Sequence, residues 1–367
     1  MRADALQRLY PVGAALRRDR SSFAIRSRRK AAPTACWCIL VGALLGACVP
    51  GIAAKDVTLT GRAMGTVWTA KIDPSGLDAA VDTGLVSRRI SERLEQLEQI
   101  FSTYRPDSEL ARFNRHAGRD WFPVTTEHAR VAAESREISA LTAGAFDVTV
   151  LPLVELWGFG AQGGAGRIPP AGEIARARAR VDWRRVEVQE NPPALRKVRG
   201  DLAADFSSLA KGFAADEVGR LLVGLGLVRH LVQVGGDVKT SGAGWPVAVE
   251  RPLEAAHEIE AVVTLSGDAL STSGDYRNFF RTGGRRYGHI LDPRTGEPVA
   301  HALAAVSVID PSCARSSALA TALFVLGPDE GWRLAERERI AALFVVRAGD
   351  GFVRRMTSEF GRRLRGP

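Results

Sequence analysis

The sequence predicts an α+β domain built mainly of antiparallel sheets with flanking helices. Two observations support this fold class. Short segments of alternating apolar and polar residues follow one another with turn residues between them. Several longer segments have the three- and four-residue apolar spacing of helices, but strands and helices do not alternate regularly, as a doubly wound parallel fold would require. No repeat with a period of 20–50 residues is present, and the length is enough for one large domain or two small ones. We expect one domain over residues 55–360.

The first half of the chain begins with a strand and continues with helices. The strand alternates strictly, and the first long helix ends in the amphipathic run ISERLEQLEQIF. A loop at a proline precedes a short helix with a side-chain cap. The expected elements are a strand over 57–72, a helix over 77–101, a short helix within 102–114 capped by Asp107 or Ser108, and a helix over 126–143.

The second half contains most of the strands. A segment rich in Gly and Pro, 158–172, is expected to form a surface loop. The elements expected after it are strands near 185–189 and 195–199, a helix over 208–226, paired strands through 231–265, strands at 286–291 and 303–309, a helix over 315–326 that ends at Gly327, and strands at 341–346 and 352–355.

Within that loop, residues 158–163 match the pattern GxGxxG. A dinucleotide fingerprint requires a strand before the glycines and a helix that opens after them. The segment continues into Pro169 and Pro170, which we expect to oppose a helix there. We therefore interpret the pattern as a loop.

The basic charge of the chain is concentrated at its N-terminus. The formal charge is +9, and residues 1–30 contain nine Lys or Arg and two Asp, a net of +7. Only +2 is left for the rest of the chain, which gives no reason to expect nucleic-acid binding.

Residues 1–54 are predicted to be an export signal. A basic region ends at Lys30 and is followed by the apolar run CWCILVGALLGA, which is too short to span a bilayer. The segment ending in Cys48 resembles a bacterial lipobox, in which the cysteine is lipidated. Ordinary cleavage near Ala53 or Ala54 is the alternative, and a twin-arginine signal at Arg28 and Arg29 fits less well. Each of these alternatives predicts a periplasmic protein, and the lipobox predicts a membrane-anchored one.

Three of the four cysteines lie in this N-terminal segment. Cys313 is the one that remains in the domain, so we expect no intrachain disulfide and no zinc site built from cysteines.

Two segments contain the residue types that phosphate chemistry needs. In DFSSLAKGFAADEV (205–218), polar residues precede a helix whose first turn has free N–H groups, and such a terminus attracts anions. In GGRRYGHILDPRTGEP (283–298), His289 lies on a strand just before a tight turn. A well-capped helix and a structural histidine are the simpler interpretations of these two segments when each is taken alone.

Together with further motifs, these segments resemble the FAD:protein FMN transferase family, also called the ApbE or flavin transferase family. The motifs occur in the family's order from Met64 to Gly327. They are MGT (64–66), STYRPDSEL (102–110), GAFD (144–147), LWGFG (156–160), DFSSLAKG (205–212), GGD (235–237), TSGDY (272–276), HILDPRTG (289–296) and SSALATALFVLG (316–327).

The resemblance implies a cleft for FAD and a set of site residues. His289 is the implied general base, a task that suits an imidazole because its ordinary pKa is near neutral. The implied FAD contacts are Met64, Tyr104, Ala145, Phe146, Asp147, Asp205, Lys211 and the backbone of Ile290. The implied magnesium ligands are the carbonyl of Ser208 and the side chains at positions 317 and 321.

One of these positions departs from the family pattern. The family has Asp where this chain has Ser317, four residues before Thr321. A hydroxyl is a poorer ligand for magnesium than a carboxylate. Either a nearby acid such as Asp275 or Asp292 compensates, or the cation binds weakly, or the protein no longer catalyses.

The resemblance further implies the reaction. A threonine hydroxyl of an exported or membrane-bound electron-transfer protein would attack the FMN phosphorus of FAD, and AMP would leave. Two alternatives stay open. One is a non-catalytic FAD-binding or carrier protein, which Ser317 favours, and the other is an FAD pyrophosphatase in which water replaces the threonine.

Overall fold

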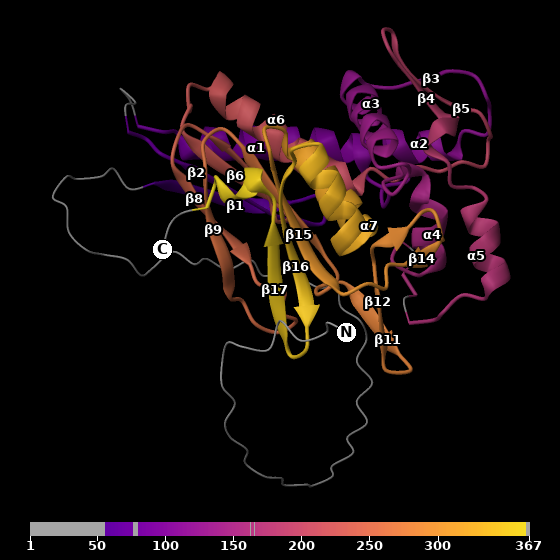
Figure 1. The fold of residues 1–367 in the computed structure, drawn as a ribbon. Coiled ribbons are helices and arrows are strands. Elements are labelled where there is room, and N and C mark those ends of the chain that lie inside the picture. The colour runs from indigo at the N-terminus through magenta and orange to yellow at the C-terminus, as the bar shows by residue number, and fades with distance from the viewer. Residues whose placement is uncertain (1–55, 76–79, 162, 165, 365–367) are drawn as a thin grey trace, which may run out of the picture. The chain divides into compact units, whose positions relative to one another are not determined.

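The computed structural model describes residues 56–75, 80–161, 163–164 and 166–364. Its centre is an eight-stranded sheet in the order β1-β2-β6-β7-β10-β15-β16-β17, and every neighbouring pair in it is antiparallel (Figure 1). The expected fold class is therefore confirmed. The predicted export signal lies outside the described residues.

The strands of the main sheet are β1 (Val57–Ala63), β2 (Thr66–Ile72), β6 (His230–Val234), β7 (Asp237–Ser241), β10 (Ala269–Gly274), β15 (Leu303–Asp310), β16 (Ala341–Ala348) and β17 (Gly351–Met356). The smaller sheets contain β3 (Phe122–Pro123), β4 (Val186–Glu190), β5 (Pro193–Lys197), β8 (Trp245–Glu250), β9 (Ile259–Leu265), β11 (Phe279–Thr282), β12 (Arg285–Gly288), β13 (Leu291–Asp292) and β14 (Glu297–Pro298).

The helices are α1 (Thr83–Phe101), α2 (Glu109–Arg115), α3 (Thr126–Leu141), α4 (Leu151–Leu156), α5 (Ala171–Arg178), α6 (Ser207–Gly224), α7 (Cys313–Arg337) and α8 (Ser358–Gly361). Two single 3₁₀ turns, η1 (Val148–Val150) and η2 (Trp183–Arg185), lie between them.

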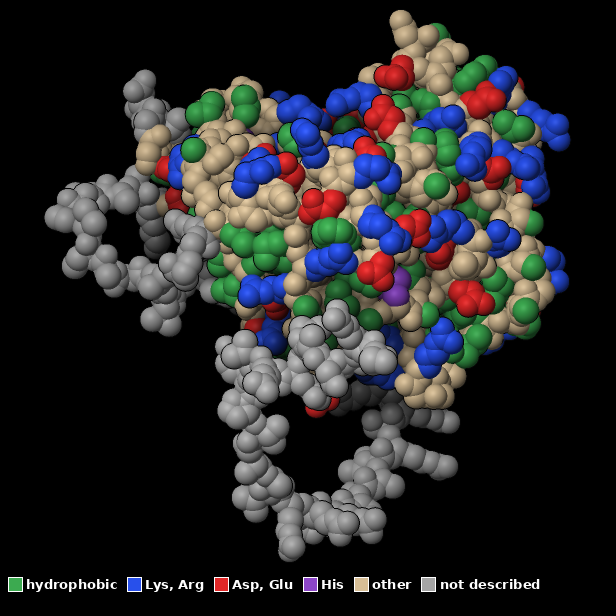
Figure 2. All heavy atoms as spheres, viewed as in Figure 1, with side chains coloured by type: hydrophobic (Ala, Val, Ile, Leu, Met, Phe, Trp, Pro, Cys, Tyr) green, Lys and Arg blue, Asp and Glu red, His purple; other side chains and the backbone are tan. Residues whose placement is uncertain are grey.

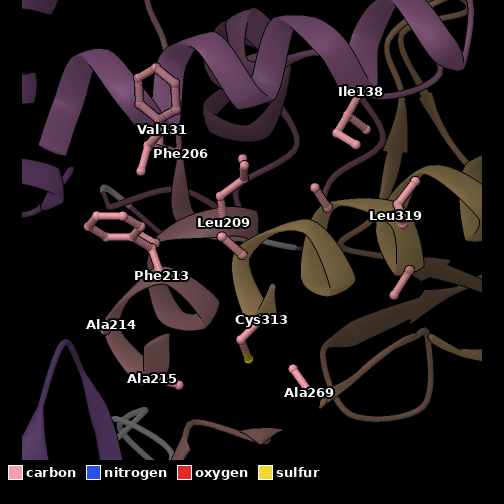
Figure 3. Close-up of a cluster of buried hydrophobic side chains, with 14 of the residues drawn as sticks. Val131, Ile138, Phe206, Leu209, Phe213, Ala214, Ala215, Ala269, Cys313 and Leu319 are labelled. Carbon is pink, nitrogen blue, oxygen red and sulfur yellow. The ribbon is translucent and has the colours of Figure 1, made fainter. Parts of the chain in front are cut away.

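Helices α1, α6 and α7 cover one face of the main sheet. Helix α6 packs on β6 and β7, and α7 packs on β10, β15 and β16. Figure 3 shows part of the apolar layer that these helices enclose: Leu209 and Phe213 of α6 lie near Val131 of α3, and Cys313 is at the start of α7. This layer is the larger hydrophobic core, and it fixes the starts of α6 and α7 near each other.

The opposite face is covered by the β8–β9 pair and α8, which enclose a second core. Alternate residues of one strand therefore enter different cores: Phe344 of β16 belongs to the first, and Leu343 and Val345 belong to the second. Burial on both faces explains why the sequences of β15 and β16 are almost continuously apolar rather than alternating.

Side-chain caps define several helix starts. The hydroxyl of Ser108 accepts the Ala111 N–H at 3.0 Å, so Ser108 is the cap of α2 and Asp107 is not. Asp82 and Thr125 cap α1 and α3 in the same way. The locations of these helices follow from cap residues that the sequence displays.

Four sequence-based expectations need correction. Residues 57–72 form two strands joined at Met64 and Gly65 rather than one strand. Prolines 169 and 170 do not oppose a helix, because α5 begins directly after them with Pro170 at its N-cap. His289 lies just past the end of β12 and not on a strand. Gly327 breaks the last long helix at φ 81° and ψ −176°, but helical structure resumes and continues to Arg337.

Within the described residues, no helix is both long and apolar enough to cross a membrane. On the face shown in Figure 2, Lys and Arg side chains are interspersed with Asp and Glu side chains. The face displayed is therefore of mixed charge.

Candidate functional site

Two of the segments with expected FAD contacts, 145–147 and the residues at Asp205, lie side by side. The N–H of Asp205, just before α6, donates to the carbonyl of Val148 at 2.7 Å. The Asp205 carboxylate accepts the Ser207 N–H at 2.8 Å and so shapes the first turn of α6. These hydrogen bonds join the segment Ala145–Phe146–Asp147 to the start of α6, where the sequence predicts that an anion binds.

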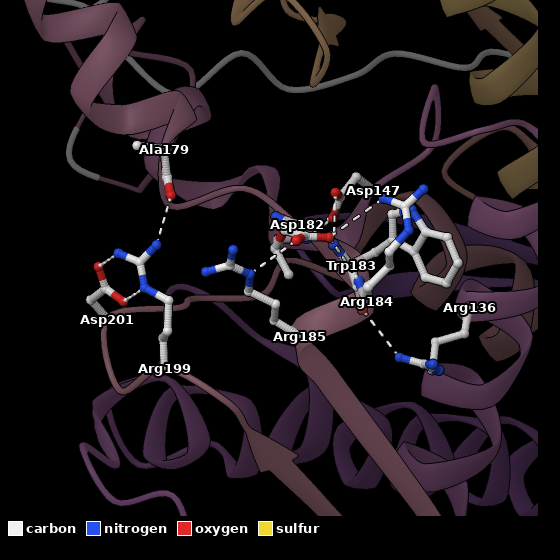
Figure 4. Close-up of polar contacts among 10 residues, drawn as sticks. Arg136, Asp147, Ala179, Asp182, Trp183, Arg184, Arg185, Arg199 and Asp201 are labelled. Atoms are coloured by element: carbon white, nitrogen blue, oxygen red, sulfur yellow. Dashed lines mark hydrogen bonds and ion pairs between the residues drawn. The ribbon is translucent and has the colours of Figure 1, made fainter.

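The Asp147 carboxylate holds its own segment in place (Figure 4). One oxygen accepts the Thr149 N–H at 2.8 Å and the Thr149 hydroxyl at 2.6 Å, and the other accepts the Trp183 N–H at 2.9 Å. Ala145 and Phe146 are buried beside it. Burial raises the pKa of Asp147, while these hydrogen bonds favour its ionised form. The side chain therefore fixes the backbone of this segment.

Lys211 lies beside the GGD turn, and the GGD turn contacts the MGT turn. A Cβ atom on Gly235 would lie 3.0 Å from Cδ of Lys211 and 3.0 Å from Cγ2 of Thr66. The Gly235 N–H donates to the carbonyl of Val67 at 3.1 Å, which joins the two turns. The ammonium group of Lys211 thus belongs to the same region as the MGT turn.

Met64 is held at that turn by helix α1. Its N–H donates to Glu98 at 2.9 Å, although its φ of 52° lies in the left-handed region that L-residues seldom adopt. Glu98 also pairs with Arg105 at 3.4 Å, next to Tyr104. Tyr104 itself is 71% exposed, so the structure places it at the edge of the region rather than within it.

The expected metal positions belong to a cluster of hydroxyl groups between α7, β7 and β10. The Thr321 hydroxyl lies 3.0 Å from the Ser273 hydroxyl, and it donates to the Ser317 carbonyl at 3.2 Å. The Ser317 hydroxyl donates to the Asp237 carboxylate at 3.2 Å. Asp237 is buried at the first position of β7. Neither its burial nor its location beside Ser317 was predicted from the sequence. The signal for it was the GGD turn, which was noted without a role.

The two acids expected to compensate for Ser317 are engaged elsewhere. Asp275 pairs with Arg347 and also lies 3.6 Å from Arg286. Asp292 pairs with Arg294 at 2.9 Å. Both carboxylates are thus paired with arginine. The acid that contacts Ser317 is Asp237.

His289 has one ring nitrogen committed to the backbone. Its Nδ1 lies 3.1 Å from the carbonyl oxygen of Asn278, which can only accept, so Nδ1 carries the proton and Nε2 keeps its lone pair. Burial lowers the pKa of His289 to about 4, and the charge of Lys211 acts in the same direction. At neutral pH the imidazole is therefore an uncharged base.

A row of stacked aromatic rings leads to His289. Trp157, Tyr287, Phe280 and Phe159 follow one another with centroid distances of 5.9, 5.2 and 5.7 Å, and Phe159 meets His289 edge-on at 6.4 Å. The rings come from the LWGFG segment and the β11–β12 hairpin. This row was missed as part of the site, although the sequence displays all four aromatic residues.

The structure thus gathers Met64, Lys211, Asp237, Ser317, Thr321 and His289 around one region, and a hydrogen bond joins Val148, next to Asp147, to Asp205 just before α6. Ser208 lies in the first turn of α6, and Ile290 is buried next to His289. Sites for FAD phosphates and a hard cation fit this donor set, which consists of the start of a helix, one ammonium group, hydroxyls and a carboxylate. Among the described residues no group of three or more His, Cys, Asp or Glu side chains is arranged for a metal, so the cation site would depend on hydroxyl and carbonyl oxygens.

Comparison with known proteins identifies the family. The ApbE family model matches residues 64–344. The chain belongs to the ApbE family. The FAD:protein FMN transferase of Escherichia coli K12 is 37% identical over 315 residues, which cover 84% of this chain and 89% of the relative.

Two solved ApbE structures have the same fold. The flavin transferase ApbE of Vibrio cholerae superposes with a TM-score of 0.78 at 35% identity, covering 84% of this chain and 99% of the other. The apo form of the Pseudomonas stutzeri flavinyl transferase ApbE gives a TM-score of 0.76 at 41% identity, covering 84% and 96%. The expected family and the expected single ApbE-like domain are therefore confirmed.

Proposed function

We propose that this chain is an FAD:protein FMN transferase that moves FMN from FAD to a threonine hydroxyl of an acceptor protein. The observation that carries the proposal is an uncharged His289 whose free Nε2 lies in the same region as Lys211 and the start of α6. The similarity to named FAD:protein FMN transferases over most of the chain supports it.

The transfer breaks the phosphoanhydride bond of FAD and forms a phosphoester bond to the acceptor. The threonine oxygen bonds to the phosphorus of the FMN half, the bridging P–O bond of the pyrophosphate breaks, and AMP leaves with the bridging oxygen. The proton of the hydroxyl passes to Nε2 of His289 and then to solvent. No oxidant or reductant takes part.

The other residues bind and orient. The ammonium of Lys211 and the positive end of the helix dipole at the start of α6 would offset the negative charge of the pyrophosphate. Met64, Tyr104 and the segment Ala145–Asp147 would position the flavin and adenine portions, and the backbone of Ile290 would contact the flavin. A magnesium ion at Ser208, Ser317 and Thr321 would supply further charge neutralisation on the phosphates.

The predicted N-terminal export signal and the proposed reaction together suggest where the protein acts. We propose that residues 1–54 direct it to the periplasm and that Cys48 is the point of a lipid anchor if the lipobox is used. The acceptor would then be an exported or membrane-bound electron-transfer protein.

In-gel flavin fluorescence tests the activity. The purified protein is mixed with FAD, magnesium and a small flavin-acceptor domain, and the gel is examined under denaturing conditions. A fluorescent acceptor band that is lost with His289→Ala supports the transferase. Free FMN plus AMP without a band would indicate a pyrophosphatase, and FAD binding without turnover would indicate a carrier.

A further inference from the structure

Asp237 is a buried carboxylate that the proposed reaction does not yet use. It is 6% exposed and begins β7, directly after two glycines with φ of 58° and 104°. These glycines allow a tight turn between β6 and β7, and the turn brings the Asp237 carboxylate next to Ser317. A buried charge requires compensating partners, which makes its neighbours informative.

The neighbours of Asp237 come from three elements. Ser317 of α7 donates to it at 3.2 Å, and Lys211 of α6 and Ser271 of β10 lie near the same carboxylate. One of these neighbours, Ser317, is the position at which the family pattern has a carboxylate. The carboxylate that position 317 lacks is therefore present on Asp237, which is hydrogen-bonded to Ser317.

The remaining donors around this pair are oxygen atoms. Thr321 lies one helical turn after Ser317, and its hydroxyl meets that of Ser273. Hydroxyl, carbonyl and carboxylate oxygens are the ligands of hard divalent cations, and the charge of the ligand set governs affinity. Without Asp237 the set of Ser208, Ser317 and Thr321 contains no anionic oxygen.

We infer that Asp237 supplies the anionic oxygen of the divalent-cation site, acting with the Ser317 hydroxyl in place of a carboxylate on α7. This inference rests on the proposed function, because the cation is the one that would neutralise the FAD phosphates. It explains how a chain with Ser317 retains a charged cation ligand, and it adds β7 to the elements that form the site.

Binding of Mn²⁺, followed by its electron paramagnetic resonance signal, tests the inference without relying on activity. The full chain is compared with Asp237→Asn, Ser317→Asp and the double variant Asp237→Asn/Ser317→Asp. We expect Asp237→Asn to weaken Mn²⁺ binding by about tenfold or more. The double variant has its carboxylate at position 317 instead of position 237. We expect it to bind Mn²⁺ with nearly the affinity of the unaltered chain.

A second contrast does not require the single Asp237 variant to fold. If Asp237 is a ligand, Ser317→Asp has two carboxylates and should bind Mn²⁺ at least about tenfold more tightly than the double variant, which has one. Equal affinities of these two proteins would overturn the inference. Asp310→Asn is the matched control, because Asp310 is a partly buried acid on β15 near the start of α7, and its Mn²⁺ affinity should not change.

FAD binding, measured by flavin fluorescence, separates this inference from the proposed function. If Asp237→Asn binds both FAD and Mn²⁺ as the unaltered chain does, the inference fails and the transferase proposal stands. If Mn²⁺ affinity follows the expected order but no form of the protein flavinylates an acceptor, the proposed function fails and the cation site stands.

Discussion

Gly212 of α6 lies directly against the backbone of Cys313 at the start of α7. A Cβ atom at Gly212 would lie 2.3 Å from the Cys313 carbonyl oxygen. That oxygen belongs to the backbone, so it cannot swing away as the end of a long side chain could. This close approach holds the helix of Lys211 against the helix of Ser317 and Thr321.

We expect Gly212→Ala to lower the free energy of unfolding by about 1–3 kcal/mol, because the methyl group forces α6 and α7 apart. Urea unfolding would measure the change. Gly224→Ala is the matched control at the other end of α6, where a Cβ atom meets nothing within 4 Å. The control should be neutral or slightly stabilising, and an equal loss in both variants would contradict the explanation.

Asp147→Ala should destabilise the protein by about 1–3 kcal/mol, because two N–H groups and one hydroxyl lose their buried acceptor. We expect weaker FAD binding as well, since the segment that begins at Ala145 would no longer be held. Asp147→Asn keeps one carbonyl oxygen and should lose less. Thermal unfolding and FAD titration measure the two effects, and unchanged FAD affinity in Asp147→Ala would argue against a positioning role.

The stability contributed by His289 should depend on pH. Its pKa is lowered from 6.5 to about 4 in the folded protein. Between these values the unfolded chain binds more protons at this position, so the contribution to the free energy of unfolding is complete above about pH 6.5 and decreases as the pH falls toward 4. The difference in unfolding free energy between the unaltered chain and His289→Asn should therefore decrease across this range. A difference that is constant from pH 7 to 4 would contradict the assigned pKa.

Lys197→Met should also destabilise the protein, by about 1–3 kcal/mol. The buried Lys197 ammonium donates to the carbonyls of Asn114, Gly200 and Leu202 at 3.0, 3.3 and 3.2 Å. These contacts fix the segment that leads to Asp205, so FAD affinity should fall together with stability. Arg196→Met is the control on the same strand: its surface pair with Glu187 is expected to contribute little.

Much of the fold follows from local signals that the sequence displays. Ser108 and Thr125 mark helix starts because their hydroxyls satisfy free N–H groups within three residues. The division of 57–72 into two strands was missed because Met64 is an unusual residue for a left-handed turn position. Helices α4 and α5 were missed because their surroundings are rich in glycine and proline, although proline is favoured at a helix start.

The candidate site could be predicted in part. His289, Lys211 and Asp205 were selected from motifs that resemble those of the family. The structure places His289 near Lys211 and joins Asp205 to Val148 by a hydrogen bond. The contact between Ser317 and Asp237 spans 80 positions, and the pairing of Asp275 with Arg347 spans 72. Which acid meets Ser317 depends on how β7, β10 and β16 are ordered in the sheet, and a linear pattern does not contain that order.

The left-handed backbone conformation of Met64 has a consequence for selection experiments. A glycine would adopt its φ of 52° without the cost of about 1–2 kcal/mol that a side chain incurs in the left-handed region. Directed evolution for heat resistance alone should therefore accept glycine at this position. Because Met64 is one of the residues proposed to position FAD, the selected variants should be more stable and bind FAD less tightly. A library screened for both properties should keep methionine. The residue at position 64 therefore affects thermal stability and FAD binding in opposite directions.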